Sequence, residues 1–291
     1  MSVQDFFART QKALKEQPWP LYARQISVLV RNEVRRNLFT RRRIWVYFIS
    51  FVPALFLLLH DIFSRGQFDA AYLEEQTQGL AILVQVYYLR LGVFFACMGI
   101  FTWLFRGEIV QRTLHYQFLS PVRREVLVVG KFLAGAIISV LLFDVAVVTC
   151  FYLFYARFGS VWQAFMFGST GLGQLGSYLV VTSLACLGYG SVFLALSLVF
   201  KNPIIPGVII MGWETISPVF PSWAQRLSVT FYLKNLCPVA IPANGPLAIF
   251  TVVAEPVSRF AAVFGLSCLA LAILVLSCFL IRRIEIMYTA E

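Results

Sequence analysis

Long apolar runs separated by short polar segments constrain this chain more than any other feature. About 20 apolar residues in a helix reach across the hydrocarbon core of a bilayer. Six runs approach or exceed that length, and the first and fifth of them are short: Ile44–Leu59, Leu89–Phe105, Val126–Phe158, Tyr178–Phe200, Ile204–Phe220 and Phe260–Ile281. The runs are continuous and do not alternate, which predicts helices and not the strands of a membrane barrel. We therefore expect an all-α, polytopic membrane bundle of six transmembrane helices.

The basic residues indicate how this bundle is oriented. The formal net charge of +10 would suggest nucleic acid as the partner of a soluble protein, but 59% hydrophobic residues and a mean hydropathy of +0.78 exclude an ordinary soluble domain. Of the 24 Lys and Arg residues, 18 lie before residue 44, in 106–131, at Lys201 or after residue 281. Basic residues favour the cytoplasmic side of membrane proteins. We expect a protein of the cytoplasmic (inner) membrane, with both termini cytoplasmic, that contacts the lipid bilayer and no nucleic acid.

Two segments outside the spans have a distinct pattern. Residues 1–43 form a basic segment, in which the break at Pro18-Trp19-Pro20 is followed by the apolar stripe Val30, Val34 and Leu38. This pattern predicts an amphipathic helix on the anionic inner leaflet, with a solvated basic tail as the alternative. Residues 44–291 then form one six-span domain. Within it, the apolar but proline-rich external segment 222–258 predicts short helices or a re-entrant hairpin before the last span.

Motifs for catalysis, metals or nucleotides are weak in this sequence. The two histidines, His60 and His115, are expected on opposite sides of the membrane, which argues against a hydrolase triad or a zinc site. The spacing of glycines in 171–176 resembles a dinucleotide-binding loop, but no strand frames it. Gly130-Lys131 lacks the earlier glycine of a nucleotide-binding P-loop. We expect no enzymatic activity and no cofactor or metal in this chain.

Two carboxylates lie inside predicted spans, where a charged group is costly. Asp144 is expected to accept a hydrogen bond from a hydroxyl group of a neighbouring helix. Glu214 precedes Ser217 and Pro218, and Pro218 is expected to break the helix of the fifth apolar run. A polar stripe at this position has two interpretations, a route for substrate or a structural contact.

The polar segment 106–131 carries the most specific pattern. It predicts two short helices that meet at a Ser120-Pro121 corner, because serine caps a helix and proline suits its first turn. The segment contains four features in this order: the acidic residue Glu108, the basic residue Arg112 before Thr-Leu, the Leu-Ser-Pro-Val corner at Leu119–Val122, and the closing pair Gly130-Lys131. This arrangement resembles the loop between the second and third spans of type-2 ABC transporter permeases. The order of parts along the chain is similar too.

The resemblance implies a function. In that family the permease acts as a pair and docks on two copies of a cytoplasmic ATP-binding subunit, which binds ATP and magnesium. The chain would then be the permease subunit of an exporter, joined to a second permease, identical or homologous. The loop 106–131 would couple it to the ATPase through Glu108, Arg112, His115, Leu119, Pro121 and Arg123.

The resemblance also implies that the second and fifth spans border the pathway. The candidate pathway residues are Phe101, Trp213, Glu214 and Ser217. Aromatic and aliphatic residues there would suit a lipid, a lipid-linked molecule or a hydrophobic drug, although packing or contact with lipid is an equal alternative for them. The competing functions are an ion- or proton-coupled secondary transporter that uses Glu214 and Asp144, and a membrane scaffold without transport activity.

Overall fold

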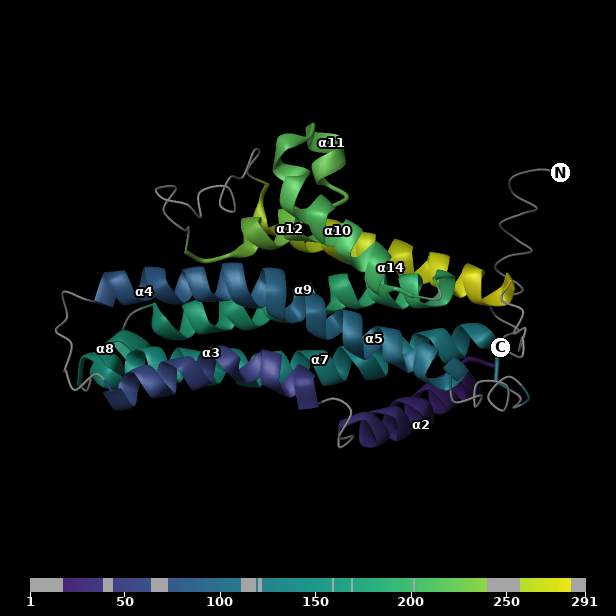
Figure 1. Ribbon diagram of the computed structural model, residues 1–291, viewed down its shortest axis with the longest axis horizontal. Coiled ribbons are helices and arrows are strands. Elements are labelled where there is room, and N and C mark those ends of the chain that lie inside the picture. The colour runs from purple at the N-terminus through teal and green to yellow at the C-terminus, as the bar shows by residue number, and fades with distance from the viewer. Residues whose placement is uncertain are drawn as a thin grey trace.

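The computed structural model describes residues 18–38, 44–63, 73–110, 119, 122–158, 160–168, 170–200, 202–239 and 257–283, and its regular elements within these ranges are all helices. Five long helical segments form the body of the molecule (Figure 1). They are α3 (Ile44–Phe63), the continuous segment α4 (Leu73–Ile82), η3 (Leu83–Gly92) and α5 (Val93–Val110), then α7 (Arg124–Tyr155), α9 (Gly171–Val199) and α14 (Arg259–Arg283). Each segment is long and apolar enough to cross a bilayer. The chain is therefore a multi-pass membrane protein with an all-α fold over the described residues.

The fifth apolar run differs from the expectation. It folds as α10 (Ile204–Ile216) followed by the 3-10 turn η5 (Ser217–Val219). The segment Ile204–Val219 is apolar but shorter than the five long helices. At 1.5 Å per residue it is about 24 Å long, which is less than the roughly 30 Å thickness of the hydrocarbon core of a bilayer. Five helices of the described chain, not six, therefore have the length of a span.

Two other spans begin earlier than the hydropathy indicates. The second apolar helix runs over Gln76–Glu108, 33 residues, because the π-helical turn η3 continues α4 into α5. The fourth begins at Gly171, so the glycines of 171–176 lie in the first turns of α9 and not in a loop. Their spacing is thus part of a helix.

The centre of the bundle is formed by α5, α7 and α9. In the second, third and fourth spans, more than half of the residues in the most apolar stretch are buried inside the protein. In α3 and in α14 the buried share of the corresponding stretch is 22%. The rings of Phe94 on α5 and Phe193 on α9 lie 4.9 Å apart, edge to face, within this core. On the flanking helices, apolar side chains such as Phe56 and Phe264 are exposed. Helices α3 and α14 therefore present their apolar faces to lipid.

Two tyrosines of η3 fix α3 to the core. Pro53 has no amide hydrogen, so the carbonyl of Ile49, four residues earlier in α3, has no helical donor. The Tyr87 hydroxyl donates to that carbonyl at 2.6 Å, and the Tyr88 hydroxyl donates to the carbonyl of Ser50 at 2.9 Å. Backbone groups in a bilayer need such partners because water is absent. The π-helical turn η3 thus carries the two side chains that donate hydrogen bonds to the carbonyls of α3 next to Pro53.

Short helices close the bundle. At one end, η4 (Ala156–Phe158) and α8 (Ser160–Gly168) connect α7 to α9. The short helices α11 (Ser222–Gln225) and α12 (Val229–Leu236) come before the last span. They agree with the prediction of short helices in 222–258, of which residues 240–256 lie outside the described ranges. Figure 1 shows α10 and α11 leaning away from the long helices, and α2 (Trp19–Leu38) lying obliquely below α7.

Candidate functional site

Helix α2 is the amphipathic helix that the sequence predicts after Pro18. The carbonyl of Pro18 accepts the amides of Leu21 and Tyr22 at 3.0 and 3.2 Å, which starts the first turn. All three residues of the apolar stripe, Val30, Val34 and Leu38, are half-buried, and Val34 and Leu38 pack against the hydrophobic core. A Cβ atom at Gly130 of α7 would lie 2.2 Å from Cδ2 of Leu29, so this glycine permits the close approach of the two helices.

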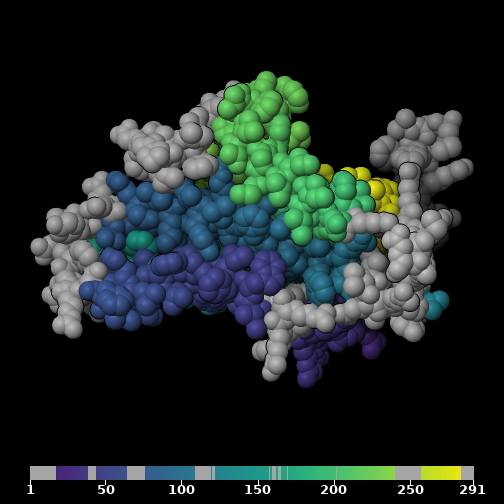
Figure 2. Space-filling view, in the orientation of Figure 1, coloured from purple at the N-terminus to yellow at the C-terminus, as the bar shows by residue number. Residues whose placement is uncertain are grey.

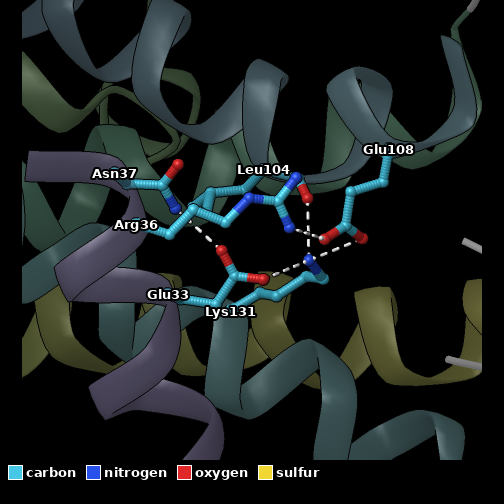
Figure 3. Close-up of polar contacts among 6 residues, drawn as sticks. All are labelled: Glu33, Arg36, Asn37, Leu104, Glu108 and Lys131. Atoms are coloured by element: carbon cyan, nitrogen blue, oxygen red, sulfur yellow. Dashed lines mark hydrogen bonds and ion pairs between the residues drawn. The ribbon is translucent and has the colours of Figure 1, made fainter. Parts of the chain in front are cut away.

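A buried ion-pair network joins α2 to the ends of α5 and α7 (Figure 3). The Lys131 ammonium lies 2.8 Å from Glu108 Oε2 and 2.9 Å from Glu33 Oε1, and it donates to the carbonyl of Leu104 at 2.9 Å. Asn37 Nδ2 donates to the other oxygen of Glu33 at 2.7 Å. Lys131 is fully buried and both carboxylates are less than a tenth exposed. One cation therefore holds three helices together.

The charges of this network balance. Arg36 supplies the second cation, with Nη1 3.6 Å from Glu108 Oε1, although its side chain is 54% exposed. Burial opposes ionisation of Glu33, but the charge of Lys131 and the hydrogen bonds from Lys131 and Asn37 outweigh it, so the pKa of Glu33 lies below its ordinary value. Glu33 is thus ionised at neutral pH. Paired and hydrogen-bonded in this way, the charges avoid the high cost of an isolated buried ion.

The start of α7 is tied to other helices as well. Arg124 donates to the carbonyls of Ile281 and Arg282 on α14 at 3.4 and 3.3 Å, and Arg282 in turn pairs with Glu125. On α2, the carbonyl of Leu38 accepts the Tyr47 hydroxyl of α3. The end of α5 and the start of α7 are therefore both anchored to other helices, through Glu108 and Lys131 and through the contacts of Arg124 and Glu125.

The predicted coupling residues fall into three groups. Glu108 is buried in the ion-pair network, so its side chain is not exposed on the surface that the described residues form, and its role in coupling stays a prediction. Leu119 is 79% exposed, and Arg123 is exposed with its guanidinium 5.2 Å from the ring of Tyr22 on α2. Arg112, His115 and Pro121, and with them the two predicted short helices, lie outside the described residues.

A second polar cluster surrounds Glu214, near the end of α10. Its carboxylate accepts the amides of Val229 and Thr230 at 3.0 and 2.9 Å and the Ser228 hydroxyl at 2.5 Å. The Ser217 hydroxyl donates to Ser228 Oγ at 3.3 Å. An anion at the first amides of a helix satisfies donors that have no partner within the helix. Glu214 therefore caps α12 and folds the chain back after α10.

Two cations lie close to this cap. Arg90 of η3 and Lys234 of α12 line an enclosed cavity of about 20 Å³, room for about one water molecule. Burial and the charge of Arg90 lower the pKa of Lys234 to about 8, an effect that Glu214 partly offsets. The cluster thus combines two basic groups and one acid between η3, α10 and α12.

The candidate pathway residues do not lie on an open route within the described part of the chain. Glu214 and Ser217 are buried beneath α12, and Trp213 is half-buried with its ring 5.1 Å from that of Phe220. Phe101 is fully buried, with Gly135 of α7 and Gly190 of α9 against its ring, so it belongs to the core. Of the acids, the prediction for Asp144 is confirmed, because Ser183 of α9 donates to it at 3.1 Å.

The sequence does not show that Glu33 and Lys131 are partners, although each of the two residues is unusual in its own helix. Glu33 is the only acid of a strongly basic helix, and Lys131 lies within a helix that is otherwise apolar over most of its length. In the described ranges, no group of three or more His, Cys, Asp or Glu residues could hold a metal ion. No protein-family model matches the sequence, and no curated protein matches it at a significant level.

Proposed function

We propose that this chain is the transmembrane permease subunit of an ATP-driven ABC exporter. The support is the motif over residues 106–131, which resembles type-2 ABC permeases, together with five helices long enough to span a membrane. In this proposal Ile204–Val219 is the sixth crossing, shortened by the turn at Ser217–Val219, and both termini are cytoplasmic. The observation that carries the proposal is the Lys131 network, which joins the end of α5 and the start of α7, the two helices on either side of that motif, to α2.

Rigid mounting matters because a docking loop transmits force only if it does not move independently of the spans. Lys131 contacts α2 through Glu33 and α5 through Glu108 and Leu104. A push on the segment between α5 and α7 therefore moves three helices together, as in rigid-body switching. ATP and magnesium are bound by the partner subunit, present in two copies. Exposed Leu119 and Arg123 contribute to the docking face, with Arg112, His115 and Pro121.

Helix α10 has the surface expected of a contact with a second permease. Ile205, Val208 and Ile209 are each more than half exposed, and Figure 2 shows α10 and α11 standing out from the body of the molecule. A pathway between two such surfaces is apolar and suits a lipid, a lipid-linked molecule or a hydrophobic drug. Trp213 lies on the same helix, and in this proposal it borders the pathway.

An ion-coupled mechanism has less support. It would use Glu214 and Asp144 as carriers, but Glu214 accepts three hydrogen bonds at the start of α12 and Asp144 accepts one from Ser183. Proton movement through Glu214 would break the cap of α12. ATP-driven flux that is indifferent to the proton gradient is the result that distinguishes the two mechanisms.

The proposal is tested by purification of the tagged, full-length protein in mild detergent. We expect an ATPase subunit to co-purify in equal amount, with ATPase activity in the eluate. Arg112→Glu and Leu119→Asp should abolish this association, whereas the control Arg226→Glu, at an exposed arginine just after α11, should preserve it. Recovery of the chain alone, without ATPase activity, would overturn the proposal.

A further inference from the structure

A groove runs between α2 and α7 on the outer side of the bundle. Its volume is about 900 Å³. The floor is apolar and comes from both helices, whereas arginines of α2 also line the groove. The larger apolar lining residues are Ile26, Val30, Val34 and Leu38 of α2 with Leu133 and Ile137 of α7, and the basic ones are Arg31 and Arg35. The groove is thus apolar in its floor and cationic at its rim.

No acidic side chain of α2 itself neutralises the positive charge of the rim. Helix α2 has a single acid, Glu33, and this side chain is buried on the other side of the helix against Lys131. Arg31 and Arg35 are exposed. An anionic group is therefore the complement that this rim requires.

The position of the groove matches the level of lipid headgroups. With 32 residues, α7 is about 48 Å long, which exceeds the roughly 30 Å of hydrocarbon by about six residues at each end if it is centred on the bilayer. Leu133 and Ile137 then lie just inside the hydrocarbon, beyond Lys131. Arg31 and Arg35 flank Glu33, whose carboxylate reaches Lys131, so they lie near the edge of the hydrocarbon, from which long arginine side chains can extend to the phosphate layer.

We infer that this groove binds one anionic phospholipid. Its phosphate lies between Arg31 and Arg35, and an acyl chain follows Val30 and Val34 towards Ile137. Selectivity comes from charge, because a neutral lipid offers the same acyl chains. Each arginine near an anionic headgroup favours it about fivefold, so the two together favour an anionic over a zwitterionic lipid about 30-fold.

Other occupants fit the rim less well. A second copy that packs α2 against α2 in a two-fold arrangement would bring the arginines of both copies together. Residues 1–17 contain three basic and two acidic side chains, so this segment also brings net positive charge to a positive rim. Like charges across a contact are unfavourable.

Native mass spectrometry of the full chain in detergent tests the inference, with phosphatidylglycerol and phosphatidylcholine of identical acyl chains as probes. We expect one phosphatidylglycerol per chain, preferred about 30-fold. The double variant Arg31→Gln/Arg35→Gln should lose this preference, and Ile137→Trp should lower the occupancy by filling the floor. The matched controls are Arg24→Gln, an exposed arginine of α2 outside the groove, and Leu141→Trp, an exposed residue one turn further along α7.

Three results would overturn the inference. The first is equal binding of both lipids by the unmodified protein. The second is an equal loss in Arg24→Gln, which would indicate general attraction to positive charge. The third is a change of oligomeric state in Arg31→Gln/Arg35→Gln with the lipid preference intact, which would make the groove a contact between subunits. Circular dichroism of each variant verifies that its helix content is unchanged.

Discussion

Replacement of Lys131 by methionine tests the network that connects α2 to the bundle. The methionine fills a similar volume but leaves Glu33 and Glu108 buried beside one another, with half-exposed Arg36 as the remaining cation that the described ion pairs contain. Loss of one partner from a buried ion pair costs about 3–5 kcal/mol. For a chain of this size we expect a fall in the unfolding temperature on the order of 10 °C.

The comparison with neutral variants isolates charge as the cause. The triple variant Glu33→Gln/Glu108→Gln/Lys131→Met removes the three buried charges and leaves only half-exposed Arg36 charged in this network. It should recover most of the lost stability, because a neutral replacement of a buried pair is often harmless. Arg36→Met removes only an exposed partner and should cost less than about 1 kcal/mol. The assay is thermal unfolding in detergent, with hydrogen exchange of the α2 amides to locate the effect.

The direction of the pH dependence gives a second readout. In the natural protein the pKa of Glu33 is lowered, so its stabilising effect is present at neutral pH and is lost as the pH falls below its ordinary value of 4.5. Without Lys131, burial dominates and raises this pKa, so mild acid should stabilise Lys131→Met. Opposite responses to acid are therefore expected. An unfolding temperature within 2 °C of the natural protein, or the same response to acid in both, would refute the reasoning.

Three further predictions concern the core and the second cluster. Gly190→Ala should lower the unfolding temperature by a few degrees, since its Cβ would lie 2.5 Å from the Phe101 ring and overpacking costs about 1–3 kcal/mol; Gly173→Ala, with open space around it, is the control. Glu214→Ala should speed hydrogen exchange at the first amides of α12 while those of α2 keep their rate. Lys234→Met should stabilise the protein at pH 7, and the gain should shrink between pH 8 and 10.5. The pKa of Lys234 is lowered from its ordinary value of 10.5 to about 8 in the folded protein, so the cost of burying this side chain as a cation is complete below pH 8 and disappears towards pH 10.5.

Hydropathy predicted the long helices because their apolar residues are contiguous. It placed the start of the second span about 13 residues too late, at Leu89 and not Gln76, because Gln76, Gln78 and Gln85 interrupt the apolar pattern there. Gln85 is nevertheless satisfied, since its amide donates to the carbonyl of Val239 at 2.6 Å. A polar side chain with a partner in a distant segment is invisible to a window along the sequence.

The roles of the charged residues depended even more on tertiary contacts. Glu33 and Lys131 are 98 residues apart in the sequence, and nothing in either segment identifies the other as its partner. Glu214 could be recognised as unusual because it lies in an apolar run, where a charged side chain is costly and therefore needs a specific role. Its role as a cap required the turn at Ser217–Val219 and the return of α12, a geometry that the spacing of the prolines does not specify.

Helix α2 carries two different surfaces, and their spacing along one helix connects them. Glu33 and Asn37 lie one turn apart and face Lys131, whereas Val30 and Val34 lie one turn apart and face the groove. Because a helix moves as a unit, anything that tilts α2 at one surface changes the other. Lipid in the groove would therefore stabilise the position of α2 in which Glu33 reaches Lys131, and loss of the ion pair should weaken lipid binding. A double variant that combines Lys131→Met with Arg31→Gln should accordingly show a loss of lipid binding different from the sum of the two single effects, since residues coupled through one rigid element are not additive.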